Sequence, residues 1–121
     1  MWAPGVDNRA RGRRGEALAA AYLEEKGCVV LARNYRALGC EVDVIAQDGE
    51  TLVFAEVKAR AGLAYGLGRE AVGPGKQAHI LRAAQSYLQE NGGFERLCRF
   101  DVLEVDLRTG RVAWIQNAFG L

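Results

Sequence analysis

The sequence predicts an α/β domain in which a mixed β-sheet of about five strands is flanked by helices, in the order α-β-β-β-α-β-β. Two segments carry apolar residues at helical spacing, and five short runs rich in β-branched residues end at turn residues. The chain has 121 residues, of which 50% are hydrophobic and 26% charged, a globular composition that excludes wholesale disorder. That length suits one core, because two independent cores would each be too small for stability. We therefore expect a single domain over residues 1–121.

The first helix follows an N-terminus, residues 1–8, that is expected to be loose. Asp7 or Asn8 can cap this helix, which should run to about Lys26 and stop at Gly27. Its apolar positions recur every three or four residues: Ala17, Leu18, Ala21 and Tyr22.

The rest of the chain alternates strands with one further helix. The expected strands are residues 28–34, 40–47, 51–59, 98–106 and 111–116. The second helix should span about residues 75–90. Between the third strand and this helix, residues 60–75 contain five glycines and are expected to form a flexible loop.

Charge and cysteine content narrow the class of protein. The net charge is +1, so any nucleic-acid partner must meet a local basic patch rather than a global positive field. The three cysteines form no C-x-x-C pair, which predicts reduced thiols and a cytoplasmic location rather than a zinc site or a disulfide framework. The longest apolar run, Ala17–Leu23, has seven residues. Since a membrane-spanning helix needs about 20, and no signal peptide pattern is present, we expect no membrane association.

A predicted β-hairpin carries the chemistry. If Asp48-Gly49 forms a two-residue turn, Asp43 lies opposite Phe54. Glu41 then lies opposite Glu56. Asp43 and Glu56 become diagonal neighbours whose Cβ atoms are roughly 7 Å apart or less. Two carboxylates at that distance can share one divalent cation, whereas a three-residue turn would separate them.

Side-chain alternation assigns residues to the two faces of the hairpin. One face collects the charged residues Glu41, Asp43, Glu56 and Lys58. The other face is wholly apolar and must be buried: Val42, Val44, Ala46, Val53, Ala55 and Val57. Near the turn, Ile45, Leu52 and Phe54 make the first face apolar too, as in a sheet covered on both sides. The charged end is a candidate cation site, or an exposed hairpin end with ordinary salt bridges.

The spacing of these residues resembles a known nuclease signature. Asp43, twelve intervening residues, Glu56-x-Lys58 resembles the PD-(D/E)XK pattern of the restriction-endonuclease-like superfamily. Three longer runs, RRGEALAAAYLEEKGCVVLARNYR, GCEVDVIAQDGETLVFAEVKAR and PGKQAHILRAAQSYL, resemble the bacterial YraN-like family of predicted nucleases. That family is similar to archaeal Holliday-junction resolvases. The resemblance covers roughly residues 12–106, with Cys40 in place of the family's glycine before Glu41, and implies a restriction-endonuclease-like core.

Chemistry and resemblance together imply roles for the charged residues. Asp43 and Glu56 would bind Mg²⁺ or Mn²⁺, with the Val57 carbonyl as a third ligand. Lys58 would orient the attacking water or stabilise the transition state. By resemblance, Glu16 in the first helix adds a further acid. Glu41 is either an outer acid or a salt-bridge partner of Lys58.

Basic residues are candidates for phosphate contacts. Lys76 and Gln77 begin the second helix, where backbone N–H groups bind phosphate readily. The candidate arginines are Arg9, Arg11, Arg13, Arg14, Arg60 and Arg69. Simple solvation is the alternative for each, and no aromatic residues are interleaved to suggest base stacking.

The sequence thus predicts a Mg²⁺-dependent endonuclease acting on DNA, with branched or damaged DNA as the implied substrate. RNA is not distinguished from DNA, and a homodimer, as in the resolvases, is left open. The alternative from another class is a non-catalytic module, on the same fold, that binds nucleic acid or protein.

Overall fold

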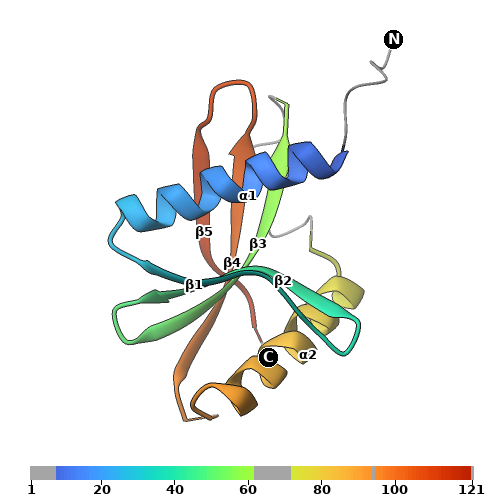
Figure 1. The fold of residues 1–121 in the computed structure, drawn as a ribbon, viewed down its shortest axis with the longest axis vertical. Helices are drawn as coiled ribbons and strands as arrows, with labels where there is room; N and C mark the ends of the chain where they lie inside the picture. Colours follow the sequence, from blue (N-terminus) through green and yellow to red (C-terminus); the bar gives the residue numbers. More distant parts are fainter. Residues whose placement is uncertain (1–7, 62–71, 94, 121) are drawn as a thin grey trace.

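A computed structural model describes residues 8–61, 72–93 and 95–120, with side chains from residue 10 onward (Figure 1). The elements are α1 (Asn8–Glu25), β1 (Val29–Ala37), β2 (Cys40–Asp48), β3 (Thr51–Arg60), α2 (Pro74–Glu90), β4 (Leu97–Asp106) and β5 (Val112–Phe119). This is the predicted order, and the predicted fold class is confirmed. Residues 1–7 of the expected loose end, and 62–71 of the expected glycine-rich loop, lie outside the described residues.

The five strands form one mixed sheet in the order β1-β2-β3-β4-β5. β3 and β4 run parallel, and the other neighbouring pairs are antiparallel. The parallel pair needs a crossover connection, and α2 lies within it. No helix in the described part of the chain has the length and apolarity needed to cross a membrane.

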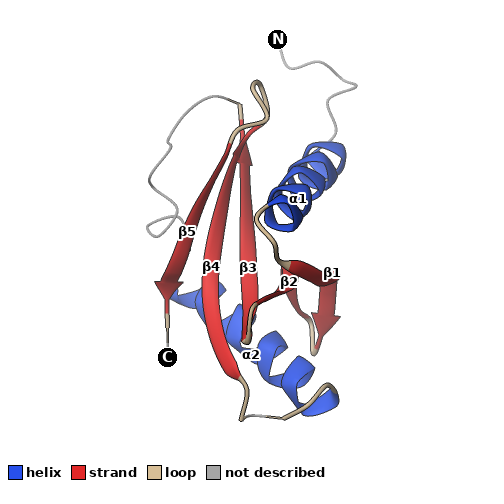
Figure 2. Ribbon diagram, turned by 90° about the vertical axis from the view of Figure 1, so that its left-hand side faces the viewer, coloured by secondary structure: helices blue, strands red, loops and turns tan. Residues whose placement is uncertain are grey.

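The helices cover opposite faces of the sheet (Figure 2), so both faces are buried. The core under α1 includes Ala19, Leu23, Val44, Ala46, Val53, Ala55, Leu103 and Val105. The core under α2 includes Val42, Ile45, Leu52, Phe54, Ile80, Ala84, Tyr87, Phe100 and Val102. A sheet covered on both sides at the hairpin turn was predicted from the apolar residues on both faces, and these two cores confirm it.

The predicted register of the β2–β3 hairpin is wrong. Asp48 pairs with Thr51, which leaves Gly49 and Glu50 as the turn and places Ile45, rather than Asp43, opposite Phe54. Gly49 has φ +60°, so a glycine stands at the first central position, as a type II′ turn requires.

The predicted alternation along β2 is also wrong. Val42 packs in the α2-side core, whereas Val44 and Ala46 pack in the α1-side core. The change of face occurs at Asp43. On the paired strand β1, Asn34 lies between the partners of Val44 and Val42 and has φ +54°, a left-handed backbone conformation. Asn34 was expected to end its strand, but β1 continues beyond it to Ala37 because asparagine tolerates this left-handed backbone conformation.

Candidate active site

β2 and β3 separate at one end of their shared hairpin, and this opening holds the candidate site. Their pairing ends at Val44 and Ala55, so Asp43 and Glu56 are the next residues along each strand. The backbone N–H of Val57 donates a hydrogen bond to Asp43 Oδ2 at 2.9 Å. Beyond the last β2–β3 backbone pair, the Val57 N–H therefore bonds to a side chain instead of a strand carbonyl, and this contact fixes the Asp43 carboxylate.

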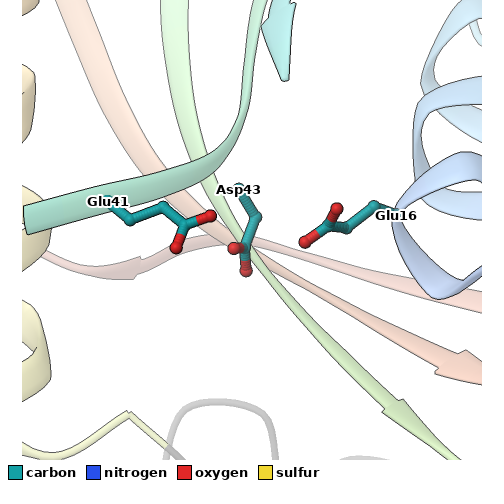
Figure 3. A group of neighbouring side chains, drawn as sticks. All are labelled: Glu16, Glu41 and Asp43. Carbon is teal, nitrogen blue, oxygen red and sulfur yellow. The ribbon is translucent and has the colours of Figure 1, made fainter. Parts of the chain in front are cut away.

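Three carboxylates meet beside this opening (Figure 3). Glu16 comes from α1, and Glu41 and Asp43 come from β2; one oxygen from each lies within 4.8 Å of the others. All three residues are half-buried. Burial raises the pKa of Glu16, as do the charges of Asp43 and Glu41, against a hydrogen bond from the Asn34 side chain that lowers it. Like charges at this separation favour a bound cation.

Glu56 is the most buried acid of the site, with 3% of its surface exposed. Its Oε2 lies 3.7 Å from Lys58 Nζ and 3.3 Å from Lys76 Nζ. Its Oε1 is buried without a hydrogen-bond partner among the described residues. Burial, and next the adjacent Asp43 carboxylate, raise the pKa of Glu56 to about 8, although both lysines act in the opposite direction.

This donor set fits a hard divalent cation. Carboxylate oxygens are the ligands that Mg²⁺ and Mn²⁺ prefer, and the unpartnered Glu56 Oε1 has an unused acceptor position. Asp43 is adjacent to Glu56 on one side and to the Glu16 and Glu41 carboxylates on the other. The predicted ligand role of the Val57 carbonyl stays a prediction.

A glycine brings α1 close to the sheet. Gly15 packs so tightly against β3 that a Cβ atom there would lie 2.5 Å from Ala59 Cβ. The next residue along the helix is Glu16, so this close approach sets how far its carboxylate reaches toward Asp43.

Two pockets adjoin the Glu16 side chain, and both include Gly12 and Glu16 among their described lining residues. The Arg60 pocket, about 370 Å³, is lined by Arg11, Gly12, Glu16, Val57, Lys58, Ala59 and Arg60. The Arg36 pocket, about 440 Å³, is lined by Gly12, Arg13, Glu16, Asn34, Arg36 and Glu41. Three of the predicted arginines, Arg11, Arg13 and Arg60, therefore lie beside the site.

Other candidates lie elsewhere. Gln77 donates from Nε2 to the Val72 carbonyl at 2.7 Å and lines a different pocket beside Phe100 and Phe119. Arg14 is exposed and lines neither pocket. The side chain of Arg9 and the whole of Arg69 fall outside the described residues.

Lys76 and Glu41 have partners that the sequence did not specify. Lys76 reaches Glu56 from the first turn of α2, and the attraction of that carboxylate, helped by Asp43 and Glu41, raises the lysine pKa although burial alone would lower it. Glu41 Oε2 lies 3.7 Å from Arg36 Nε, whereas Lys58 pairs with Glu56.

Sequence reasoning missed Asn34 and Arg36. An asparagine is uncommon inside a strand, and this signal was interpreted as the end of the strand instead of a kink. No feature of the sequence pointed to Arg36, because it lies near Glu41 only when β1 continues past Asn34.

Comparison with known proteins places the chain in a family. It is similar to a UPF0102 protein of Syntrophus aciditrophicus, with 46% identity over 118 residues that cover 96% of this chain and 93% of the relative. A UPF0102 protein of Pelotomaculum thermopropionicum is 43% identical over 112 residues, covering 89% of this chain and 93% of the relative.

Among solved structures, that of SfsA from Pyrococcus furiosus in complex with Ca²⁺ aligns with 96% of this chain and 66% of that chain. Its TM-score is 0.32 and its identity 17%, too low to support an argument. The uncharacterised protein family UPF0102 matches residues 15–105, which include every acid and lysine of the site. The chain belongs to this family, the YraN family whose motifs it resembles.

Proposed function

We propose that the protein is a divalent-metal-dependent nuclease that hydrolyses DNA phosphodiesters. The observation that carries this proposal is the convergence of four carboxylates with Lys58 and Lys76 where β2 separates from β3. The carboxylates are those of Glu16, Glu41, Asp43 and Glu56. α1, β2, β3 and α2 each contribute to this one opening, as a reaction centre on a rigid scaffold requires.

The charges of the site support a cation requirement. Both lysines contact the same oxygen, Glu56 Oε2, and Arg36 lies near Glu41. In the described part of the chain, no basic side chain forms an ion pair with Glu16 or Asp43. When bound there, Mg²⁺ or Mn²⁺ supplies a water of lowered pKa and neutralises charge on the phosphate.

The protein's own groups do the positioning. The Val57 amide holds the Asp43 carboxylate, and Lys58 lies beside Glu56, where its ammonium can orient a water and stabilise a phosphoryl oxygen. Lys76 approaches the same carboxylate from α2 and supplies a second positive charge.

A second candidate is a nucleic-acid-binding module without turnover. The arginine-lined pockets favour it, because phosphate binding by arginine needs no metal. The two functions differ in their need for metal. A pure binding module should bind DNA without Mg²⁺, Asp43→Asn should retain or strengthen its affinity, and no condition should lead to cleavage.

A cleavage assay tests the proposal. Linear, single-stranded, flapped and four-way-junction DNA would be incubated with the protein in Mg²⁺, Mn²⁺ or EDTA. We expect cutting in either metal, none in EDTA, and a loss of about 100-fold or more for Glu56→Gln, the scale typical of removing one electrostatic group at a reaction centre.

Glu50→Gln is the matched control, because Glu50 is an exposed acid in the turn of the same hairpin. It should cut like the wild type. Absence of cutting on every substrate, with DNA bound equally in Mg²⁺ and EDTA, would replace the nuclease with the binding module.

A further inference from the structure

Glu16 borders two pockets that extend along different strands of the sheet. The Arg60 pocket extends along β3, past Lys58 to Arg60, and the Arg36 pocket extends along β1, past Asn34 to Arg36. Among the described residues, Gly12 and Glu16 are common to both linings. Glu16, one of the clustered acids, therefore borders two pockets that each contain arginines.

The arginines of these pockets are available to a ligand. In the described part of the chain, no carboxylate forms an ion pair with Arg11, Arg13 or Arg60. Arg36 contacts Glu41 at 3.7 Å with a side chain that is 76% exposed, so this pair is weak and solvated. Arginines beside carboxylates that they do not pair with can bind the phosphates of an added anion.

This arrangement, an acid beside two groups of arginines, matches the successive phosphates of a nucleic-acid strand. The reacting phosphate of the proposed nuclease meets the acids together with their cation, while the phosphates on either side of it need positive partners of their own. We propose that one DNA strand crosses the acidic cluster, with the phosphate on one side of the reacting linkage in the Arg60 pocket and the phosphate on the other side in the Arg36 pocket. This inference rests on the proposed function for the place of the reacting linkage.

The pocket linings also indicate what the site recognises. The described residues of these linings have charged or polar side chains apart from Val57 and Ala59, and none of these described residues is aromatic. Contacts to phosphates fix the register of a strand and carry no sequence information, whereas base stacking needs aromatic faces. The described residues of the two pockets therefore favour contacts to the backbone of the strand, which predicts little preference for sequence.

Salt dependence of binding tests the two pockets separately. Fluorescence anisotropy would measure the Kd of a labelled single-stranded DNA oligonucleotide in EDTA across a series of NaCl concentrations. Arg60→Gln and Arg36→Gln should each weaken binding several-fold and lower the slope of log K against log salt by about 1. Arg82→Gln and Arg108→Gln, exposed arginines that line neither pocket, should match the wild type.

A second arm places the two pockets on the strand. In Mg²⁺, single uncharged methylphosphonate linkages would be introduced on either side of the mapped cut. A methylphosphonate on one side of the cut should slow cutting by the wild type but cause no further slowing in Arg60→Gln. A methylphosphonate on the other side should likewise slow the wild type but cause no further slowing in Arg36→Gln. If one linkage is silent in both variants, both pockets serve the same side and the proposed path is wrong.

The outcomes separate this inference from the nuclease itself. Cutting by the wild type, with wild-type salt slopes in both arginine variants, overturns the path and leaves the nuclease standing. Reduced slopes without cutting on any substrate support phosphate binding in both pockets but overturn the nuclease, and with it the path across a reacting linkage.

Discussion

At the scale of single residues, Glu56 shows why burial matters to this site. It is nearly inaccessible to solvent, one of its oxygens has no hydrogen-bond partner among the described residues, and a second carboxylate lies beside it. Each of these features disfavours the ionised form, and two lysines offset them only in part. A group in this position is costly to the fold and useful to a bound cation.

This cost makes stability depend on pH. The folded-state pKa of Glu56, about 8, is above its ordinary value of 4.5, so the folded protein holds the proton more tightly than the unfolded chain. The resulting stabilisation is complete below about 4.5 and is lost as the pH rises through about 8. Glutamine at this position carries no charge at any pH. The free energy of unfolding of Glu56→Gln, measured relative to that of the wild type, should therefore be about 2–5 kcal/mol higher at alkaline than at acidic pH.

Urea unfolding in EDTA, at about pH 5 and about pH 9, would measure this difference. Glu50→Gln, which changes an exposed acid, should show no such trend. A difference between Glu56→Gln and the wild type that stays constant with pH would show that Glu56 is ionised throughout.

At the scale of elements, the packing of α1 against β3 positions Glu16. Gly15 has no room for a Cβ, whereas a Cβ at Gly12, one turn earlier in the same helix, would meet no atom within 4 Å. Replacing glycine by alanine stabilises a helix interior by about 1 kcal/mol where space allows. The two positions therefore separate the helical preference of alanine from its steric cost.

Gly12→Ala should stabilise the protein by up to about 1 kcal/mol. Gly15→Ala should destabilise it by about 1–3 kcal/mol, because the added methyl overlaps Ala59 and forces α1 away from β3. The free energy of unfolding in urea measures both changes. The displaced helix also moves Glu16, so metal-dependent activity should fall in Gly15→Ala.

The double variant Gly15→Ala/Ala59→Gly tests the steric cause, since it removes the methyl that the new Cβ would meet. It should recover part of the lost stability. A destabilisation that Ala59→Gly does not relieve would place the cause elsewhere in α1.

At the scale of the whole molecule, a second charged cluster ties the sheet together. Asp101 of β4 is fully buried and accepts hydrogen bonds from Arg99, from Trp114 Nε1 at 2.8 Å and from the Asn117 amide at 2.8 Å. Arg99 also contacts Asp48 of β2 at 3.0 Å. Both carboxylate oxygens of Asp101 have hydrogen-bond partners, in contrast to Glu56, which identifies the cluster as structural.

Asp101→Asn should destabilise the fold by about 3–5 kcal/mol, because it leaves Arg99 with a weaker partner in a largely buried position. Thermal or urea unfolding measures the loss. Asp106→Asn is the matched control: its Oδ1 accepts a turn hydrogen bond from the Arg108 amide, which asparagine can also accept, so its stability should change by less than about 0.5 kcal/mol. Equal effects of the two substitutions would contradict the structural role of the cluster.

Most of the fold followed from local pattern. Both helices and all five strands lie where periodicity and turn residues placed them, with ends that differ by up to three residues. The register of the β2–β3 hairpin could not be predicted from local pattern. Asp48-Gly49 and Gly49-Glu50 are both acceptable two-residue turns, and only the packing of the sheet selects between them. The predicted alternation of β2 was wrong because the strand changes face between Val42 and Val44, next to the left-handed Asn34 of β1.

The site divides in the same way. The acids and Lys58 were identified from their types and spacing, and the structure brings Glu16, Glu41, Asp43 and Glu56 together. The separation of β2 from β3, the contact of Lys76 with Glu56, and the place of Arg36 beside Glu41 all join residues that local pattern does not connect.

The sequence by itself determined the α/β class, the order of elements and the membership of UPF0102, because these depend on periodicity, turn chemistry and motif spacing along one chain. Tertiary structure alone decided the hairpin register, the burial of Glu56 and the pair of basic pockets around Glu16. Burial and electrostatics depend on what lies nearby in space, and the packing of α1 and α2 on opposite faces of the sheet sets those neighbours.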